Sequence, residues 1–237
     1  MSFNIRLLLP FFIPIIIMGQ ESLLFSAGRP SAGEPSTVVP KGFFQFESGW
    51  RKNESRSRNV LVRMGLTNRI ELRFSLDDII TDHEPFYGGF MGGIMYQLTK
   101  EDRKRLESAL YVTVSAPNRD DGVSFDGATY KFFAALSAFM GDIGLDFNLG
   151  GSSYSETFTV FYTAGVGYDL TDKISVFIEA YGHALTSGFP ELVQSVDGGI
   201  TYRPFHVFQI DINGGLGLTE KGEDTFVEVG LAFRLPH

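Results

Sequence analysis

Residues 65–74 read Gly-Leu-Thr-Asn-Arg-Ile-Glu-Leu-Arg-Phe, and a similar stretch returns at 168–178 as Tyr-Asp-Leu-Thr-Asp-Lys-Ile-Ser-Val-Phe-Ile. Each copy is a short polar turn followed by a segment in which apolar and polar residues alternate. Asn68 and Asp172 stand in the turns, where residues that tolerate special backbone angles are preferred. Alternation with a period of two gives a strand one apolar and one polar face. Repeated from end to end, this unit predicts one large antiparallel sheet.

The composition favours an all-β chain. The 237 residues include 23 Phe and 27 Gly, no Cys, and a formal net charge of −8 at pH 7. Without Cys, the chain has neither disulfides nor thiolate metal sites. The many Phe and Gly residues, with little helical patterning, indicate tightly packed strands. The negative charge argues against nucleic acid as a partner, because phosphate contacts require a basic surface.

The first 41 residues are expected to lie outside the sheet. Arg6 precedes an apolar run at 7–18, which is shorter than the roughly 20 residues of a membrane-spanning helix. This pattern predicts a secretory signal peptide over residues 1–19, which could extend to 27, and an uncleaved anchor is the alternative. Residues 20–41 are rich in Ser, Gly and Pro, and they are predicted to form a flexible periplasmic lead-in with no core of its own.

From residue 42 onward the chain alternates between strand-like segments and turns. The segments are 42–50, 58–66, 70–76, 87–97, 106–115, 128–140, 143–150, 154–169, 174–183, 192–203, 207–217 and 225–235. Short connections such as 66–69 and 171–173 alternate with long polar ones such as 77–86 and 116–127. We therefore predict an all-β fold over residues 42–237: a single antiparallel transmembrane β-barrel of about 12 strands with short periplasmic turns and longer extracellular loops.

The apolar face of this sheet is expected to meet lipid. Aromatic residues gather near the predicted strand ends, among them Trp50, Tyr96, Tyr168 and Tyr202, where interfacial girdles occur in membrane barrels. The expected location is the outer membrane of a Gram-negative-type bacterium. The expected partners are outer-membrane lipid, the outer-membrane assembly machinery and a small-molecule solute. The alternative is a soluble exported β-protein that buries the same face in its own core.

The order of several short phrases resembles a known family. The phrases are Arg-Pro-Ser-Ala-Gly-Glu-Pro-Ser at 29–36, Val-Leu-Val-Arg-Met-Gly-Leu-Thr-Asn-Arg-Ile-Glu-Leu-Arg at 60–73, Val-Gly-Tyr-Asp-Leu-Thr-Asp-Lys at 166–173 and Val-Gly-Leu-Ala-Phe-Arg at 229–234. Together they resemble the outer-membrane family labelled "putative MetA-pathway of phenol degradation", whose members are called transporters. The resemblance implies an outer-membrane barrel that acts as a transporter or channel for small aromatic or hydrophobic solutes.

The polar face of the sheet would line the lumen of such a barrel. The predicted lining residues are Gln45, Glu47, Arg63, Glu71, Arg73, Glu107, Lys131, Asp146, Glu179, Asp197, Asp211, Glu228 and Arg234. Acids outnumber bases in this set, so an open lumen would favour cations or neutral polar solutes. The alternative is a structural or surface-binding barrel whose lumen is closed by salt bridges, because bare charges in a narrow lumen are costly.

No catalytic, cofactor or metal site is predicted. His183, Ser187 and Glu191 are the strongest combination for a hydrolase, but they lie at no diagnostic spacing for a catalytic triad. The acidic stretches at 82–84 and 118–121 are expected to be solvated loop tips. The sequence therefore predicts that the protein is not an enzyme.

Overall fold

The computed structural model describes residues 25–53, 56–80, 85–99, 106–119, 122, 123, 125, 127–154, 157–185 and 192–236. The predicted signal peptide at 1–19 and the acidic stretch at 82–84 lie outside these residues, as do Ser187 and Glu191. Within the described part of the chain, no helix is long and apolar enough to cross a membrane.

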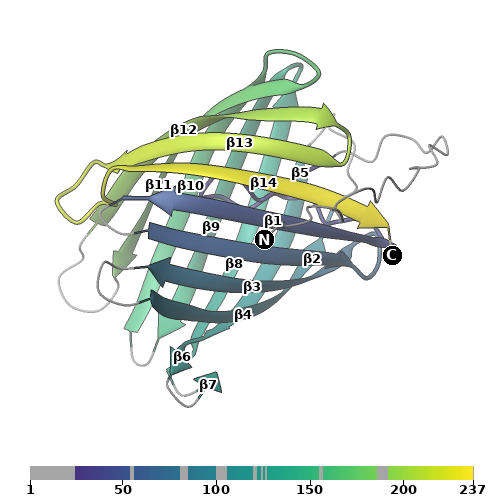
Figure 1. The fold of residues 1–237 in the computed structure, drawn as a ribbon. Coiled ribbons are helices and arrows are strands. Elements are labelled where there is room, and N and C mark those ends of the chain that lie inside the picture. Colours follow the sequence, from purple (N-terminus) through teal and green to yellow (C-terminus); the bar gives the residue numbers. More distant parts are fainter. Residues whose placement is uncertain are drawn as a thin grey trace, which may run out of the picture.

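Twelve long strands close into one antiparallel barrel (Figure 1). They are β1 Phe43–Lys52, β2 Arg56–Gly65, β3 Ile70–Ile80, β4 Pro85–Gln97, β5 Glu107–Ala116, β8 Thr129–Met140, β9 Ile143–Tyr154, β10 Thr157–Asp169, β11 Ile174–Leu185, β12 Leu192–Phe205, β13 Phe208–Gly217 and β14 Phe226–Pro236. Two short strands, β6 Asn118–Arg119 and β7 Gly122–Val123, pair with each other outside the barrel. Each strand pairs with its neighbours along the chain, and β1 pairs with β14 to close the barrel. This confirms the predicted fold.

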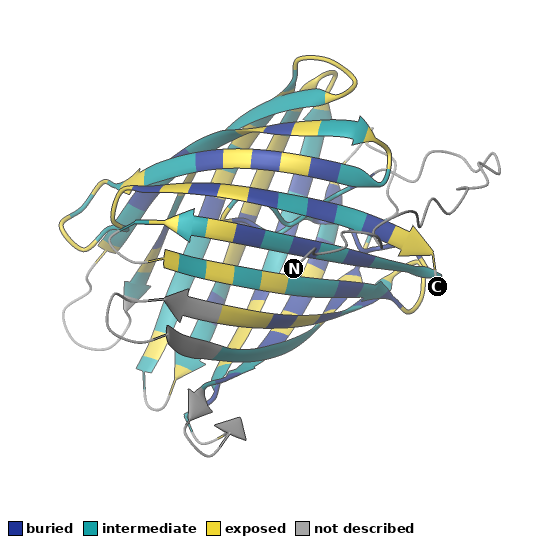
Figure 2. Cartoon of the chain, viewed as in Figure 1, coloured by how far each residue is buried: buried dark blue, intermediate teal, exposed yellow. Residues whose placement is uncertain are grey.

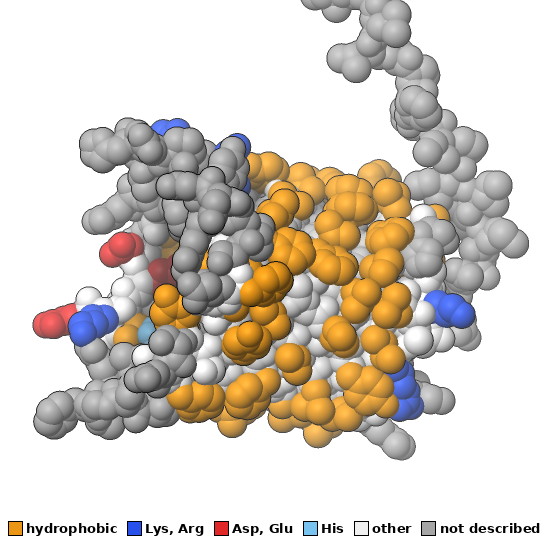
Figure 3. Space-filling model, turned by 90° about the horizontal axis from the view of Figure 1, so that it is seen from below, with side chains coloured by type: hydrophobic (Ala, Val, Ile, Leu, Met, Phe, Trp, Pro, Cys, Tyr) orange, Lys and Arg blue, Asp and Glu red, His pale blue; other side chains and the backbone are white. Residues whose placement is uncertain are grey.

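The two faces of the wall separate as the alternation predicts. On β3, Phe74 and Leu76 are exposed while Glu71, Arg73 and Ser75 are buried. Figure 2 shows the same alternation of buried and exposed residues along strands in front of the view, such as β13 and β14. On the face shown in Figure 3, hydrophobic side chains cover the middle of the outer wall, and charged side chains lie toward its ends. A protein in water buries its apolar face, so this distribution excludes the soluble alternative and identifies lipid as the outer solvent.

Some connections at the outer end are shorter than expected, including that between Lys52 of β1 and Arg56 of β2. The turns at 66–69, 141–142, 170–173 and 206–207 mark the periplasmic end, which also carries the start of β1 and the end of β14. At the outer end, β9 extends to Tyr154 and β10 begins at Thr157, so a short connection stands among the longer ones. The predicted segment at 143–150 stopped four residues too early, because Gly150 and Gly151 resemble a turn in composition.

Residues 25–41, named here the inner segment, lie inside the barrel. Ser36, Val38 and Val39 are almost completely buried. The lead-in predicted for 20–41 is therefore corrected for its described part: this stretch is neither outside the barrel nor without packing partners. Its small residues let an irregular backbone follow the wall closely, and wall side chains satisfy the backbone polar groups that regular structure would otherwise pair.

Candidate functional site

The inner segment makes one circuit of the inner wall. Its hydrogen-bond partners, taken in order from Gly28 to Val39, are Glu47 on β1, Glu228 on β14, Asp211 and Asn213 on β13, Glu179 on β11, Asn148 on β9, Ser137 on β8, Gln97 on β4 and Glu71 on β3. This is the order in which the strands follow one another around the barrel. The segment therefore forms a ring against the wall, which narrows the lumen at one level.

Arg63 holds both arms of this ring. Its Nη1 donates to the carbonyl oxygen of Ser26 at 3.0 Å, and its Nη2 donates to that of Thr37 at 3.1 Å. The same guanidinium pairs with Glu47 at 3.0 Å and with Glu71 at 2.8 Å, and these three side chains are almost completely buried. All its charge and donors are thus satisfied, as a buried arginine requires.

A second charged contact fixes the ring against the nearby strands β13 and β14. The guanidinium of Arg29 pairs with Glu228 at 2.6 Å and with Asp211 at 3.3 Å. It lies over Gly49 of β1 and Gly230 of β14, which are direct cross-strand partners. A Cβ atom on either glycine would overlap the guanidinium. The pair of glycines therefore forms a niche shaped for this side chain.

Elsewhere the wall binds the backbone of the ring. Glu179 accepts hydrogen bonds from the backbone N–H groups of Ala32 at 2.7 Å and Gly33 at 3.1 Å. The side chain of Asn148 accepts from the backbone N–H of Glu34 at 2.6 Å and donates to its carbonyl oxygen at 3.1 Å. These wall groups recognise peptide groups, so they fix the path of the chain without requiring particular side chains.

One side of the lumen is apolar and aromatic. Tyr111 on β5 meets Phe133 on β8 edge to face, with 4.7 Å between ring centroids, and Phe133 meets Phe161 on β10 at 5.7 Å. Met95 and Val38 join the same buried cluster. The lumen lining predicted from the sequence contained only polar residues and omitted this cluster. The alternation along the strands could have identified the cluster, because Phe133 shares a face with Lys131 and Tyr111 shares a face with Glu107.

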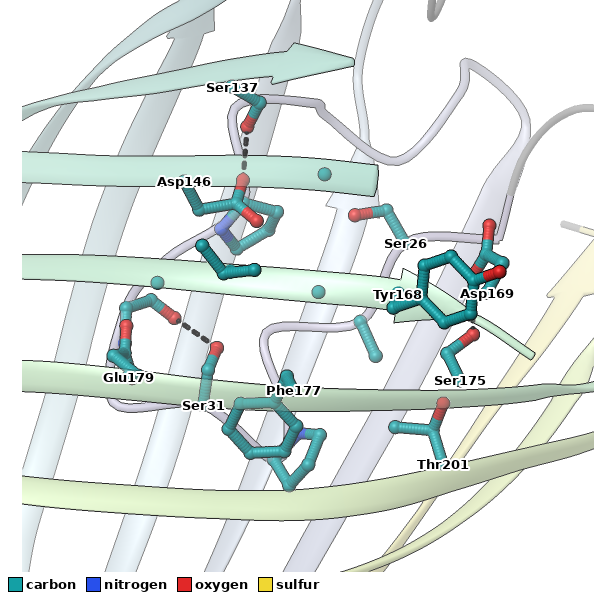
Figure 4. Close-up of a pocket in the computed structure, with 18 of the residues that line it drawn as sticks. Ser26, Ser31, Ser137, Asp146, Tyr168, Asp169, Ser175, Phe177, Glu179 and Thr201 are labelled. Carbon is teal, nitrogen blue, oxygen red and sulfur yellow. Dashed lines mark hydrogen bonds between the residues drawn. The ribbon is translucent and has the colours of Figure 1, made fainter. Parts of the chain in front are cut away.

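The ring divides the lumen into two cavities. The outer cavity has a volume of about 370 Å³, and its lining includes Tyr111, Phe133, Phe161, Lys131 and His183. The periplasmic cavity has a volume of about 240 Å³, and its lining includes Ser137, Asp146, Ser175, Glu179 and Thr201. Figure 4 shows this second cavity, with the hydroxyl of Ser137 donating to Asp146. Glu34 of the ring lines both cavities, so the ring is the partition between them.

The structure brings the predicted lining residues together inside the barrel. Eleven of them are buried: Gln45, Glu47, Arg63, Glu71, Arg73, Glu107, Glu179, Asp197, Asp211, Glu228 and Arg234. The other two are exposed to the cavities, Lys131 to the outer one and Asp146 to the periplasmic one. Among the described side chains, no group of three or more His, Asp and Glu residues is placed to hold a metal ion.

Comparison with known proteins agrees with this architecture. A family model described as "Putative MetA-pathway of phenol degradation" matches residues 27–235. Solved structures with the same fold include a NanC porin, with 11% identity, a TM-score of 0.63 and coverage of 81% of this chain and 100% of that chain. They also include the COG4313 outer membrane channel from Pseudomonas putida F1, with 15% identity, a TM-score of 0.61 and coverage of 87% and 100%.

A third similar structure is described as the CymD monoaromatic hydrocarbon channel, with 11% identity, a TM-score of 0.51 and coverage of 84% of this chain and 89% of that chain. A search of curated proteins found no match. At these identities the likenesses establish the fold. Together with the apolar outer wall, they confirm the predicted location in the outer membrane.

Proposed function

We propose that this chain, which belongs to the family described as "Putative MetA-pathway of phenol degradation", forms an outer-membrane passage for small aromatic solutes. The observation that carries the proposal is the aromatic lining of the outer cavity. A similar structure is described as a monoaromatic hydrocarbon channel, which supports the same class of solute.

The outer cavity has the size and chemistry for one aromatic ring. Its volume of about 370 Å³ lies in the range of small-molecule sites, which are mostly apolar with a few polar groups. Phe133 and Phe161 offer ring surfaces, and Lys131, Thr113 and Ser115 offer polar contacts on the same wall. Aromatic pairs in edge-to-face or offset geometry add about 0.5–1.5 kcal/mol beyond the area they bury, which favours aromatic over aliphatic solutes.

The second candidate is a permanently closed barrel that binds its ligand from outside. The ring and the buried pairs of Arg63 with Glu47 and Glu71 favour it, because they fill the lumen below the outer cavity. The salt-bridged lumen predicted as the alternative from the sequence has the same physical basis. Binding and passage are therefore measured separately.

Phenol is a suitable probe for both measurements. We expect the purified protein to bind phenol, detected by saturation-transfer NMR, and to carry it into proteoliposomes. Replacing Phe133→Leu removes an aromatic surface of the cavity and should weaken binding several-fold. The matched control is Phe132→Leu, because Phe132 is the next residue along β8 and is exposed on the lipid side.

Equal phenol binding by the two variants and the parent protein would contradict the proposed cavity. Binding without uptake would identify the closed barrel instead. An exposed aromatic on the outer wall cannot contact a solute in the lumen, so a defect in Phe132→Leu alone would also count against the proposal.

A further inference from the structure

We propose that the inner segment, residues 25–41, is a displaceable gate, and that its withdrawal joins the two cavities into one continuous lumen. The proposal rests on the proposed passage only in assuming that solutes cross the barrel. It is carried by three features of the contact between segment and wall: the arginines of the wall keep carboxylate partners within the wall, peptide groups of the segment make most of its hydrogen bonds, and Arg29 and Glu34 supply its side-chain ion pairs.

The wall keeps its own ion pairs when the segment is absent. Arg63 pairs with Glu47 and Glu71, and Arg73 pairs with Glu71, all within the wall. Arg51 likewise pairs with Glu228. A segment built only to fill the barrel would leave such charges unpaired on leaving, and buried unpaired charges are costly. Withdrawal of the segment removes the ion pairs that Arg29 makes with Asp211 and Glu228 and that Glu34 makes with Arg73.

Arg29 and Glu34 are named here the two latches of the gate. Arg29 pairs with Glu228 and Asp211, and Glu34 pairs with Arg73. Their partners stand on different strands of one side of the barrel, β13 and β14 for Arg29 and β3 for Glu34. Loss of either contact releases a different arc of the segment.

The rest of the segment is held mostly by hydrogen bonds of its peptide groups, including two from Arg63, and water can replace such bonds. Glu179, Asn148 and Gln97 bind its peptide groups, and the two cavities bring solvent to both sides of the partition. A hydrogen bond exchanged for one to water has a small net free-energy cost. The buried hydrophobic side chains of the segment are Phe25, Val38 and Val39, of which Val38 belongs to the aromatic cluster.

The segment also has a place to pivot. It joins β1 through Gly42, whose φ of 86° is strained for other residues and which has open space around its Cα. Just before that turn, the carbonyl oxygens of Val39 and Pro40 lie directly on Gly65 of β2, where a Cβ atom would overlap them. The wall is thus shaped to seat the segment next to its pivot.

The first test loosens the gate and measures ion current in planar bilayers with potassium chloride. Arg29→Ala removes one latch, and the fraction of open time should rise about tenfold, because the loss of a buried charge-assisted hydrogen bond shifts an equilibrium by roughly that factor. Gly65→Ala unseats the other arm and should also raise it. The control is Arg56→Ala, which removes an exposed positive charge at the outer end of β2.

The second test locks the gate. The hydroxyl oxygens of Ser36 in the segment and Ser137 on β8 are 2.8 Å apart, and the chain contains no Cys. Adding Ser36→Cys and Ser137→Cys to the Arg29→Ala protein should therefore allow a single disulfide. The oxidised protein should lose the added current and the reduced protein should regain it. The Arg29→Ala protein with Ser36→Cys alone should not respond to reductant.

Unchanged current in both loosened variants would overturn the proposal, and so would equal currents from the oxidised and reduced locked protein. Heat-modifiable migration on gels checks that each variant is a folded barrel, and Gly65→Ala serves if Arg29→Ala does not fold. Potassium and chloride carry the current, so this outcome is independent of phenol binding. The current and phenol-binding measurements therefore distinguish a barrel that has a gate but no aromatic site from one that has an aromatic site but no gate.

Discussion

The inner wall of the barrel has two unlike sides. The charged side, on β13, β14, β1, β2 and β3, carries Arg63, Arg73 and their carboxylate partners, and it holds both latches of the inner segment. The aromatic side, on β4, β5, β8 and β10, carries Tyr111, Phe133 and Phe161 and borders the outer cavity. On the charged side, ion pairs and hydrogen bonds hold the inner segment. On the aromatic side, the apolar surface of the outer cavity leaves space for a solute.

The two sides also differ in how they respond to truncation. A buried ion pair that loses one partner leaves an uncompensated charge, which costs about 3–5 kcal/mol. An aromatic pair that loses one ring forfeits contact and stacking, and next to a cavity the gap can fill with water. The charged side is therefore expected to be the more sensitive to substitution.

Arg63→Ala should have the largest effect. Its guanidinium binds Glu47, Glu71 and two carbonyl oxygens of the inner segment, so its loss leaves two buried carboxylates with fewer partners. We expect the free energy of unfolding, measured in urea with detergent-refolded protein, to fall by about 3–5 kcal/mol. The exposed Arg56 on the same strand supplies the control, and Arg56→Ala should change it by less than about 0.5 kcal/mol. Similar values for the two would mean that the charged side does not stabilise the barrel.

Tyr111→Leu probes the boundary between the two sides. The ring of Tyr111 lies 4.7 Å from the guanidinium of Arg73 and edge to face with Phe133. Losing one cation–π contact and one aromatic pair should lower the free energy of unfolding by about 1–2 kcal/mol. Tyr130→Leu replaces an exposed tyrosine of β8 on the lipid side and should have a smaller effect. If Tyr111→Leu equals Arg63→Ala in effect, the two sides are not energetically distinct.

Much of the wall is predictable from sequence because its signal is local. Alternation along 70–74 and 174–178 marks strands and identifies the lipid face without knowledge of the partners. The end of β9 was missed for a tertiary reason: Gly150 and Gly151 lie against the backbone or rings of Phe132, Phe133 and Phe158, where a Cβ atom would overlap. From sequence alone, glycines that close packing requires look the same as glycines that form a turn.

The inner segment could not be predicted because its partners are remote in the chain. Gly33 and Glu179, for example, are 146 residues apart. Composition describes what a segment does alone, and a Ser-, Gly- and Pro-rich stretch alone is flexible. The aromatic side was missed for another reason: polar residues alone were taken to mark the lumen, although Phe133 lies two residues from Lys131 and therefore on the same face of β8.

The smallest expected effect concerns ion selectivity at the junction of the two sides. Glu179 on β11 and Asp197 on β12 are direct cross-strand partners, and both are almost completely buried. Glu179 binds peptide N–H groups of the inner segment, and within the described part of the chain Oδ1 of Asp197 has no hydrogen-bond partner. Like charges placed directly opposite each other in a sheet repel, so this pair attracts a cation once the segment moves away.

In the Arg29→Ala background, the added changes Glu179→Gln and Asp197→Asn should therefore lower the permeability ratio of potassium to chloride by about twofold, read from reversal potentials in a salt gradient. Glu220→Gln with Asp224→Asn, both on the exposed connection between β13 and β14, is the matched control for the loss of two carboxylates. An equal change in the control would assign selectivity to the outer mouth. No change in either would mean that permeating ions do not pass this junction, and the charged side would then serve only to hold the segment.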